Sequence, residues 1–317
     1  MRKIFPFVIL LLLSTATIIQ AQSGAPAEQT WLFDGRVRNY ELHIPETLDD
    51  SAPLVIALHG RGDTGSGMEA LTHFDNLADR EGFMVAYPDG LNYEWNFVRG
   101  VHGYDMSQDD TAFLVALIDH IADDHPVDKT RVYLVGFSNG GLMVQRAACE
   151  NPAPFAAFAS VSAALFGGIT DVCPETRDIR APMLLINGTA DTNIPWEGTS
   201  VEQNGQTIYI TYPVSDTLGF WSVFNKCPLD ADTSDLPQLG ESPDTQVRLF
   251  VMKCPTDTAV LLYRIAGGGH TWPGQKADDA QMGSINRDID ASEEIWKFFA
   301  QHQRVNVEAT AAATSEP

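Results

Sequence analysis

A serine that lies between two glycines is the strongest chemical signal in the sequence. Gly136-Phe137-Ser138-Asn139-Gly140 is a GxSxG motif, with a short apolar run before it and a helical pattern after it. In a sharp turn from strand to helix, the serine hydroxyl is exposed and the glycines relieve crowding. A serine hydroxyl is a poor nucleophile at its own pKa, so it requires a base and a group that orients the base. We therefore expect Ser138 to be a nucleophile.

Two later apolar runs lead into residues that suit the other two roles. Met183 to Ile186 is followed by a short loop that ends at Asp191, and Val260 to Ile265 is followed by three glycines and His270. Because the carboxyl ends of parallel strands meet at one edge of a sheet, both side chains are expected near Ser138. We expect His270 to be the base and Asp191 to orient it. The alternatives are a loop-capping aspartate and an ordinary loop histidine.

Two backbone amides are expected to stabilise the oxyanion of such a reaction. One is the amide of Asn139, directly after the serine. The other comes from the loop His59-Gly60-Arg61-Gly62, where Arg61 is the first choice and Gly60 the second. Loss of one such donor typically costs about 3–4 kcal/mol in the transition state.

Three tryptophans lie in loops that follow predicted strands, at Trp95, Trp196 and Trp272. Each loop is expected at the edge of the sheet that carries Ser138. Flat aromatic faces suit sugar rings, phenolic rings or a polyester chain, so these residues are candidates for substrate binding. The alternative for each is ordinary packing within its loop.

Short apolar strands alternate with helices along the chain and would position these residues. The strands are expected at 37–44, 54–58, 83–87, 131–135, 155–162, 183–186 and 260–265, and the helices at 68–80, 109–123, 139–149 and 292–301. This alternation predicts an α/β fold, with a mostly parallel sheet covered by helices on both faces. We expect one catalytic domain over 31–303, with a polar insertion at 197–258 before the last strand. Residues 22–30 read as a flexible leader, and 304–317 as a disordered tail.

The N-terminus and the cysteines point to export. Arg2 and Lys3 precede an uncharged apolar stretch over 4–19, and small residues follow it, so 1–22 reads as a secretory signal peptide rather than a membrane anchor. The protein is then expected to be secreted, either extracellular or periplasmic. Four cysteines in an exported chain suggest disulfides, and three pairings are possible. Proximity in the sequence favours Cys149–Cys173 and Cys227–Cys254, while four free thiols are the alternative.

The charge of the chain excludes one class of partner. There are 42 acidic and 20 basic residues among 317, a net charge of −22. Such a chain repels phosphates, so we expect no nucleic-acid partner. We also expect that the mature form does not associate with a membrane. With 44% hydrophobic residues the chain can form a core, which excludes intrinsic disorder.

Several motifs together resemble one family over about residues 35 to 300. They are Leu58-His59-Gly60, Trp95-Asn96, Asp109-Asp110-Thr111-Ala112-Phe113, Arg131-Val132-Tyr133, the GxSxG motif with Gly141, and Gly268-Gly269-His270-Thr271-Trp272-Pro273-Gly274. In this order they resemble the secreted polyhydroxybutyrate depolymerase and feruloyl esterase group of α/β-hydrolases. The resemblance implies serine ester hydrolysis by Ser138, Asp191 and His270 without a metal or other cofactor.

The resemblance leaves the substrate open. Members of the group cleave hydroxyalkanoate polyesters, feruloyl esters on plant polysaccharide, or acetyl groups on xylan. We therefore expect an ester substrate, either a polyester oligomer or an acylated plant polysaccharide. The alternatives are an acetylxylan esterase, a serine peptidase of the same fold, and a non-catalytic polymer-binding protein.

Overall fold

The computed structural model of the protein describes residues 27–98, 108–173, 179–203, 206–240, 242–275 and 282–304. The predicted signal peptide over 1–22 lies outside these ranges, as does the predicted tail apart from Arg304. Among the residues described, no helix combines the length and the apolar character that crossing a membrane requires.

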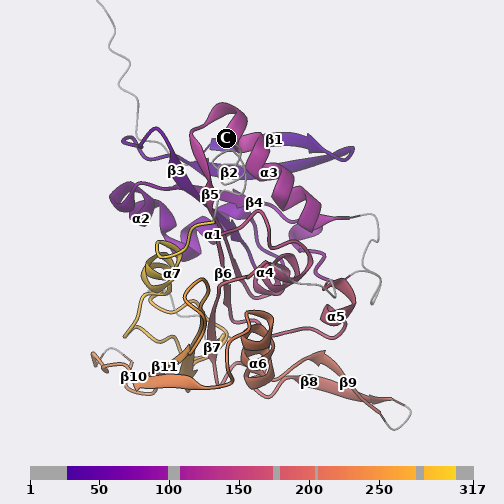
Figure 1. The fold of residues 1–317 in the computed structure, drawn as a ribbon, viewed down its shortest axis with the longest axis vertical. Helices are drawn as coiled ribbons and strands as arrows, with labels where there is room; N and C mark the ends of the chain where they lie inside the picture. Colours follow the sequence, from indigo (N-terminus) through magenta and orange to yellow (C-terminus); the bar gives the residue numbers. More distant parts are fainter. Residues whose placement is uncertain are drawn as a thin grey trace, which may run out of the picture.

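A large mixed sheet forms the centre of the described chain (Figure 1). Its strand order is β1-β2-β4-β3-β5-β6-β7-β12-β11-β10. The bounds are β1 Ala27–Phe33, β2 Arg36–His43, β3 Ala52–Leu58, β4 Met84–Pro88, β5 Val127–Phe137, β6 Ala157–Val161, β7 Met183–Gly188, β10 Ala231–Asp235, β11 Gln246–Met252 and β12 Val260–Ala266. The six central strands from β4 to β12 are parallel, and the outer pairs are antiparallel. A separate hairpin is made by β8 Thr199–Gln203 and β9 Gln206–Thr211.

Helices cover both faces of the sheet, as the alternation of strands and helices predicts. The bounds are α1 Gly65–Thr72, α2 Phe74–Glu81, α3 Asp110–Asp124, α4 Asn139–Glu150, α5 Ile169–Val172, α6 Val214–Phe224 and α7 Ala291–Phe299, and a short 3₁₀ turn covers Leu91–Tyr93. Strand β3 shows how the two cores form: Leu54 and Ile56 pack on the face with α3, α4 and α6, whereas Val55 packs on the face with α1, α2 and α7. Such alternation follows from the two-residue period of a strand.

The N-terminal part of the fold corrects two predictions. Residues 27–30 belong to β1 rather than to a flexible leader, because β1 pairs with β2 along its whole length. The Trp31 ring also stacks on His120 of α3, with ring centroids 4.4 Å apart. The helix predicted over 68–80 is two helices, because His73 adopts a left-handed conformation (φ 50°) that ends α1 and begins α2.

The segment 197–258 is only in part an insertion. It contains the β8–β9 hairpin and α6, but β10 and β11 extend the main sheet beyond β12. Strand β10 has the sequence Ala-Asp-Thr-Ser-Asp and is largely exposed, so it lacks the apolar alternation by which a strand is recognised. Asp235 at its end contacts Arg248 of β11, and Asp230 directly before it contacts Lys253 directly after β11; both carboxylates are exposed.

Two disulfides join elements that flank the parallel strands. Cys149 in the last turn of α4 is bonded to Cys173 directly after α5, and Cys227 after α6 is bonded to Cys254 after β11. These are the two pairs that proximity in the sequence favours.

Candidate active site

Ser138 occupies the sharp turn between β5 and α4. Its backbone has φ 54° and ψ −116°, a conformation that residues other than glycine rarely adopt. Its amide donates to the carbonyl of Val161 at 2.9 Å. A Cβ atom on Gly136 would meet the backbone of Gly140, and one on Gly140 would meet the backbone of Leu58. Both glycines of the motif are therefore required, because the backbone passes too close to them for a side chain. The surrounding contacts hold Ser138 in its strained conformation.

His270 lies between Ser138 and Asp191. Its Nε2 atom is 2.8 Å from the Oγ atom of Ser138, and its Nδ1 atom is 2.7 Å from the Oδ2 atom of Asp191. The side chains of His270 and Asp191 are only 2% and 1% exposed. A carboxylate only accepts hydrogen bonds, so Nδ1 carries the proton and donates, and Nε2 accepts from the serine hydroxyl. In this tautomer the imidazole is placed to take a proton from Ser138.

The loops that carry these two residues are held by their own backbone. The other oxygen of Asp191, Oδ1, accepts from the amides of Asn193 and Ile194, both at 2.8 Å. The amide of His270 donates to the carbonyl of Met282 at 2.7 Å. Each side chain thus has little freedom to turn away from Ser138.

Asn139 begins α4, so its amide has no acceptor within the helix. Its side chain is held by the backbone of Trp95: Oδ1 accepts from the Trp95 amide at 2.7 Å, and Nδ2 donates to the Trp95 carbonyl at 3.4 Å. The contact fixes the first turn of α4 against the loop that follows β4. The Asn139 amide is therefore available at a well-defined place beside Ser138.

His59 holds the loop that carries the second candidate donor. The amide of Gly90 donates to its Nε2 atom at 2.9 Å, so Nδ1 carries the proton and donates to the Gly60 carbonyl at 2.7 Å. Burial of this imidazole lowers the pKa of His59, which keeps it neutral. At Gly60 an added Cβ would lie 3.6 Å from the Cβ of Ser138, so the loop passes directly beside the serine. Arg61 follows, with its guanidinium 3.0 Å from Glu94.

A cavity of about 1280 Å³ opens at Ser138 and His270. Gly60, Arg61 and Asn139 line it at one side, and Phe97, Val98 and Leu142 form an apolar wall. Strand β9 and part of β8 form another wall, with Val201, Ile208 and Ile210 among the lining residues. This volume exceeds the range of about 300–1,000 Å³ that is usual for ligand sites, so the cavity has room for more than an acetyl group.

The three predicted tryptophans do not line this cavity. Trp95 is fully buried and its Nε1 donates to the His59 carbonyl at 3.1 Å. Trp272 is 2% exposed and its Nε1 donates to Oγ of Ser292 at 3.2 Å. Trp196 is partly buried, with the guanidinium of Arg264 over its ring. Burial leaves Trp95 and Trp272 no exposed ring face for a substrate, while Trp196 lies outside the residues that line this cavity.

Besides His270, the aromatic residues that line the cavity are Phe97, Phe137, Tyr209 and Tyr212. Phe137 belongs to the GxSxG motif, but sequence reasoning identified none of the four as a cavity residue. Phe97 comes two residues after Trp95, which carried the more obvious signal. The tyrosines lie in and directly after β9, in a polar segment where no pattern indicates a strand beside the serine.

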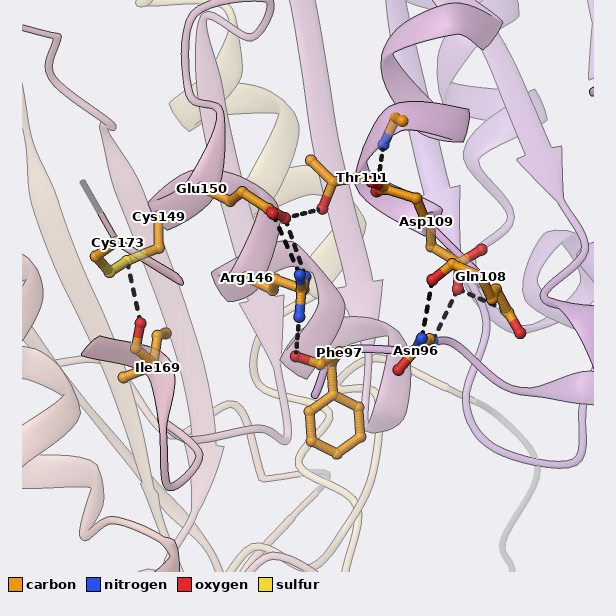
Figure 2. A network of polar contacts seen from close by, with 12 residues as sticks. Asn96, Phe97, Gln108, Asp109, Thr111, Arg146, Cys149, Glu150, Ile169 and Cys173 are labelled. Atoms are coloured by element: carbon orange, nitrogen blue, oxygen red, sulfur yellow. Dashed lines mark hydrogen bonds and ion pairs between the residues drawn. A yellow bond between two sulfur atoms is a disulfide. The ribbon is translucent and has the colours of Figure 1, made fainter. Parts of the chain in front are cut away.

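Buried charges hold the wall that contains Phe97. Figure 2 shows Arg146 of α4 between Glu150 and Phe97. Its Nε atom is 3.0 Å from Oε2 of Glu150, its Nη1 atom donates to the Phe97 carbonyl at 3.0 Å, and Thr111 donates to the same glutamate oxygen at 2.6 Å. Because α4 begins directly after Ser138, these contacts fix the position of Phe97 relative to the serine.

A fully buried ion pair, Arg38–Asp110, holds the same loop at Asn96. Asp110 accepts from Nη1 of Arg38 at 2.9 Å through one oxygen, and from the Asn96 amide at 2.8 Å and Nε2 of Gln108 at 2.7 Å through the other. Arg38 is 3% exposed and Asp110 is 1% exposed. The neighbouring Asp109 has a different role: it is the N-cap of α3 and accepts from the Ala112 amide.

The described residues contain no cluster of three or more histidine, cysteine, aspartate or glutamate side chains that could hold a metal ion. The arrangement at Ser138 consists of the side chains and backbone amides described above. They supply a hydroxyl, an imidazole that accepts a hydrogen bond from it, and amides beside it. These are the parts that acyl transfer requires.

Comparison with known proteins gives the same chemistry. The family model "Esterase PHB depolymerase" matches residues 39–183. A feruloyl esterase C from Emericella nidulans is 32% identical over 270 residues, which are 83% of each chain. A putative esterase, NocK, from Nocardia uniformis is 29% identical over 290 residues, 84% of this chain and 80% of that one.

A solved structure supports the fold. The acetyl xylan esterase from Aspergillus awamori superposes with a TM-score of 0.62 over 87% of this chain and 99% of that chain, at 15% sequence identity. The likeness shows the α/β-hydrolase fold, as the sequence predicts. With the relatives above, it places the chain in one family: the protein is a carboxylic-ester hydrolase of the polyhydroxybutyrate depolymerase and feruloyl esterase family.

Proposed function

We propose that Ser138, His270 and Asp191 form the catalytic triad of this esterase. The single observation that carries the proposal is the pair of contacts at His270, 2.8 Å to the serine hydroxyl and 2.7 Å to the carboxylate. A base within hydrogen-bond reach of a nucleophile, itself oriented by a third group, is the arrangement that activates a serine.

The reaction then takes two steps. Ser138 Oγ attacks the ester carbonyl carbon while His270 Nε2 takes the hydroxyl proton, and a tetrahedral oxyanion forms. The oxyanion collapses, the alcohol leaves with the proton from His270, and the acyl group stays on Ser138. Water attacks this acyl-enzyme with the same imidazole as base, which releases the acid and restores the serine. Asp191 stabilises the imidazolium that forms in both steps.

The amide of Asn139 and the amide of Arg61 are the proposed oxyanion donors, with the Gly60 amide as the alternative to Arg61. The proposal is supported by the place of Asn139 at the start of α4 and by the passage of the Gly60 loop beside the serine. Backbone amides that are already oriented need no rearrangement when the charge develops.

The substrate we propose is either a polyester oligomer or an acylated plant polysaccharide, in which the enzyme cleaves an ester bond. The feruloyl esterase among the relatives and the volume of the cavity at Ser138 both support a substrate larger than an acetyl ester.

We also propose that the protein is secreted, with 1–22 as its signal peptide and one catalytic domain over 31–303, which β1 extends to Ala27. Two disulfides in the described chain support an oxidising compartment outside the cytoplasm.

The test compares the mature protein with a Ser138→Ala variant on methyl ferulate, acetylated xylan and short 3-hydroxybutyrate oligomers. The proposal predicts turnover on at least one of these esters by the wild type, and a loss on the order of 10⁶ in kcat in the variant. Turnover of the variant at the wild-type rate would refute the role of Ser138. Turnover of acetylated xylan alone would leave the triad in place and refute the preference for larger acyl groups.

A further inference from the structure

The β8–β9 hairpin is a separate piece of sheet that contributes to the cavity. In Figure 1 it projects from the lower edge of the molecule, beside α6. Within the described part of the chain, its two strands pair with each other and with no other strand, apart from an isolated bridge between Thr211 and Phe166. Although the hairpin comes after Asp191 in the chain, most of the described length of β9 lies along the cavity that holds Ser138.

Three aliphatic residues of the hairpin are exposed and line this cavity. Val201 is 49% exposed, Ile208 is 42% exposed and Ile210 is 48% exposed, and all three line the cavity. Val201 and Ile208 are directly opposite in the hairpin register, and Ile210 follows two residues later in β9. Together they offer an apolar surface at which a ligand would displace water, which is the source of hydrophobic binding.

The base of the hairpin is held firmly. The Gly167 amide donates to the Ile210 carbonyl at 3.0 Å, and the Tyr212 amide donates to the Leu165 carbonyl at 2.7 Å. A Cβ atom on Gly167 would meet the carbonyl oxygen of Tyr209, so only glycine lets the two segments approach this closely. The rings of Tyr209 and Tyr212 stack with centroids 4.7 Å apart.

The hairpin is also connected, through Phe166, to Phe97 of the apolar wall. Phe166 forms the bridge to Thr211, and its ring packs edge-to-face on Phe97 with centroids 5.2 Å apart. The Phe97 carbonyl is in turn held by Arg146 of α4, the helix that begins after Ser138. The apolar surface of the hairpin therefore has a fixed position relative to the serine.

We propose that the β8–β9 hairpin selects substrates by the size of the apolar group they carry away from the ester carbonyl. The inference rests on the proposed role of Ser138. A long acyl chain or an aryl group would cover Val201, Ile208 and Ile210, while an acetyl ester with a small alcohol would leave them in contact with water. Contacts made only by the larger substrate raise its kcat/KM relative to that of the smaller one.

The apolar and uncharged character of these three side chains sets the chemistry of the group they bind. An aryl ring or an alkyl chain replaces water at such a surface, whereas a charged group would lose hydration without gaining a partner. The hairpin thus favours neutral, apolar substituents.

The test uses Val201→Thr, Ile208→Thr and Ile210→Thr. Threonine keeps the branched Cβ that suits a strand and replaces apolar surface by a hydroxyl. Each variant is assayed on two series of esters. The first series varies the acyl group with 4-nitrophenol as the constant leaving group: acetate, butyrate, octanoate and ferulate. The second keeps the acetyl group and varies the alcohol from methyl to octyl.

A matched control is Val251→Thr. Val251 lies on β11 and does not line the cavity. It is 39% exposed, against 49% for Val201 on the hairpin. Thermal unfolding of all four variants reports whether the substitution itself disturbs the fold.

The proposal predicts that, in one of the two series, each hairpin variant lowers the ratio of kcat/KM for the largest ester of the series to kcat/KM for its smallest ester by about threefold to tenfold. The series in which the ratio falls identifies the side of the ester that the hairpin contacts. The kcat/KM of Val251→Thr is expected to stay at the wild-type level on every ester of both series.

Unchanged ratios in both series, or an equal loss on small and large substrates, would overturn the proposal. Failure of the proposed triad looks different, because Ser138→Ala would then hydrolyse 4-nitrophenyl acetate at the wild-type rate. The two inferences can therefore fail separately.

Discussion

The carboxylate of Asp191 lies 2.7 Å from Nδ1 of His270, and neither side chain is more than 2% exposed. The two residues are 79 positions apart in the chain and follow two neighbouring parallel strands, β7 and β12. Because a buried carboxylate strengthens the preference of Nδ1 for its proton, the contact determines which imidazole nitrogen faces Ser138. The account of the site depends on this contact.

Replacement of Asp191 by asparagine tests the contact. Asparagine can still accept from the amides of Asn193 and Ile194 through its oxygen, so the fold is retained. Its NH₂ group facing Nδ1 favours the wrong tautomer of His270. We expect kcat to fall by about 10⁴, by analogy with the same change in other triads. Steady-state kinetics with thermal unfolding as control gives the result; a loss below tenfold contradicts the role of Asp191.

The adjacent residues Asp109 and Asp110 are expected to differ sharply in their effect on stability. Asp110→Ala leaves Arg38 buried without its partner, which typically costs about 3–5 kcal/mol. Asp109→Ala removes the N-cap of α3, a change that typically costs about 1 kcal/mol. Urea unfolding of both variants measures the difference. Equal losses would show that the buried pair contributes no more than the cap.

Glu69 predicts a dependence of stability on pH. Burial, followed by hydrogen bonds and charge from Glu41 and Asp75, raises the pKa of Glu69 from 4.5 to about 8. Between these values the folded protein holds a proton that the unfolded chain has released. The free energy of unfolding therefore falls as pH rises from about 4.5 to about 8.

Glu69→Gln removes this titration. The variant should match the wild type near pH 5, because glutamine resembles the protonated acid, and should be the more stable protein near pH 9. Urea unfolding at the two pH values gives the comparison. A difference between the two proteins that is the same at both pH values would contradict the shifted pKa.

The disulfide Cys227–Cys254 closes a loop with a sequence separation of 27. In the chain-entropy model its removal costs about 3–4 kcal/mol. The double variant Cys227→Ser and Cys254→Ser is therefore expected to unfold at lower urea concentration while its kcat stays near the wild-type value, since neither cysteine lines the cavity. Unfolding of the wild type with and without a reductant provides the control. Unchanged stability would contradict a structural role.

The sequence predicts the parts of the site that lie at strand ends. Ser138, Asp191 and His270 each follow a continuous apolar run, and such runs are recognisable because parallel strands are buried on both faces. The turn chemistry of the GxSxG motif adds a second, local signal. These residues could be brought to one edge of the sheet without any knowledge of the loops.

The walls of the cavity could not be predicted in the same way. The β8–β9 hairpin is mostly polar and exposed, and its position depends on backbone contacts with 165–167 that leave no pattern in the sequence. Whether each tryptophan is exposed or buried could not be predicted for a related reason. A large indole in a loop suits either a binding face or a buried support, and the hydrogen bonds that bury Trp95 and Trp272 become apparent only in three dimensions.

The most direct test of the account is the site of covalent labelling by a fluorophosphonate. The reagent reacts with a serine only where a base activates it, so it reports the triad without any choice of substrate. The account predicts one adduct per wild-type chain, mapped by peptide mass spectrometry to Ser138, and none in Ser138→Ala. A folded His270→Ala variant is expected to be labelled more slowly than the wild type, because it lacks the base. An adduct on another serine, or hydrolysis by a Ser138→Ala variant at the wild-type rate, would contradict it.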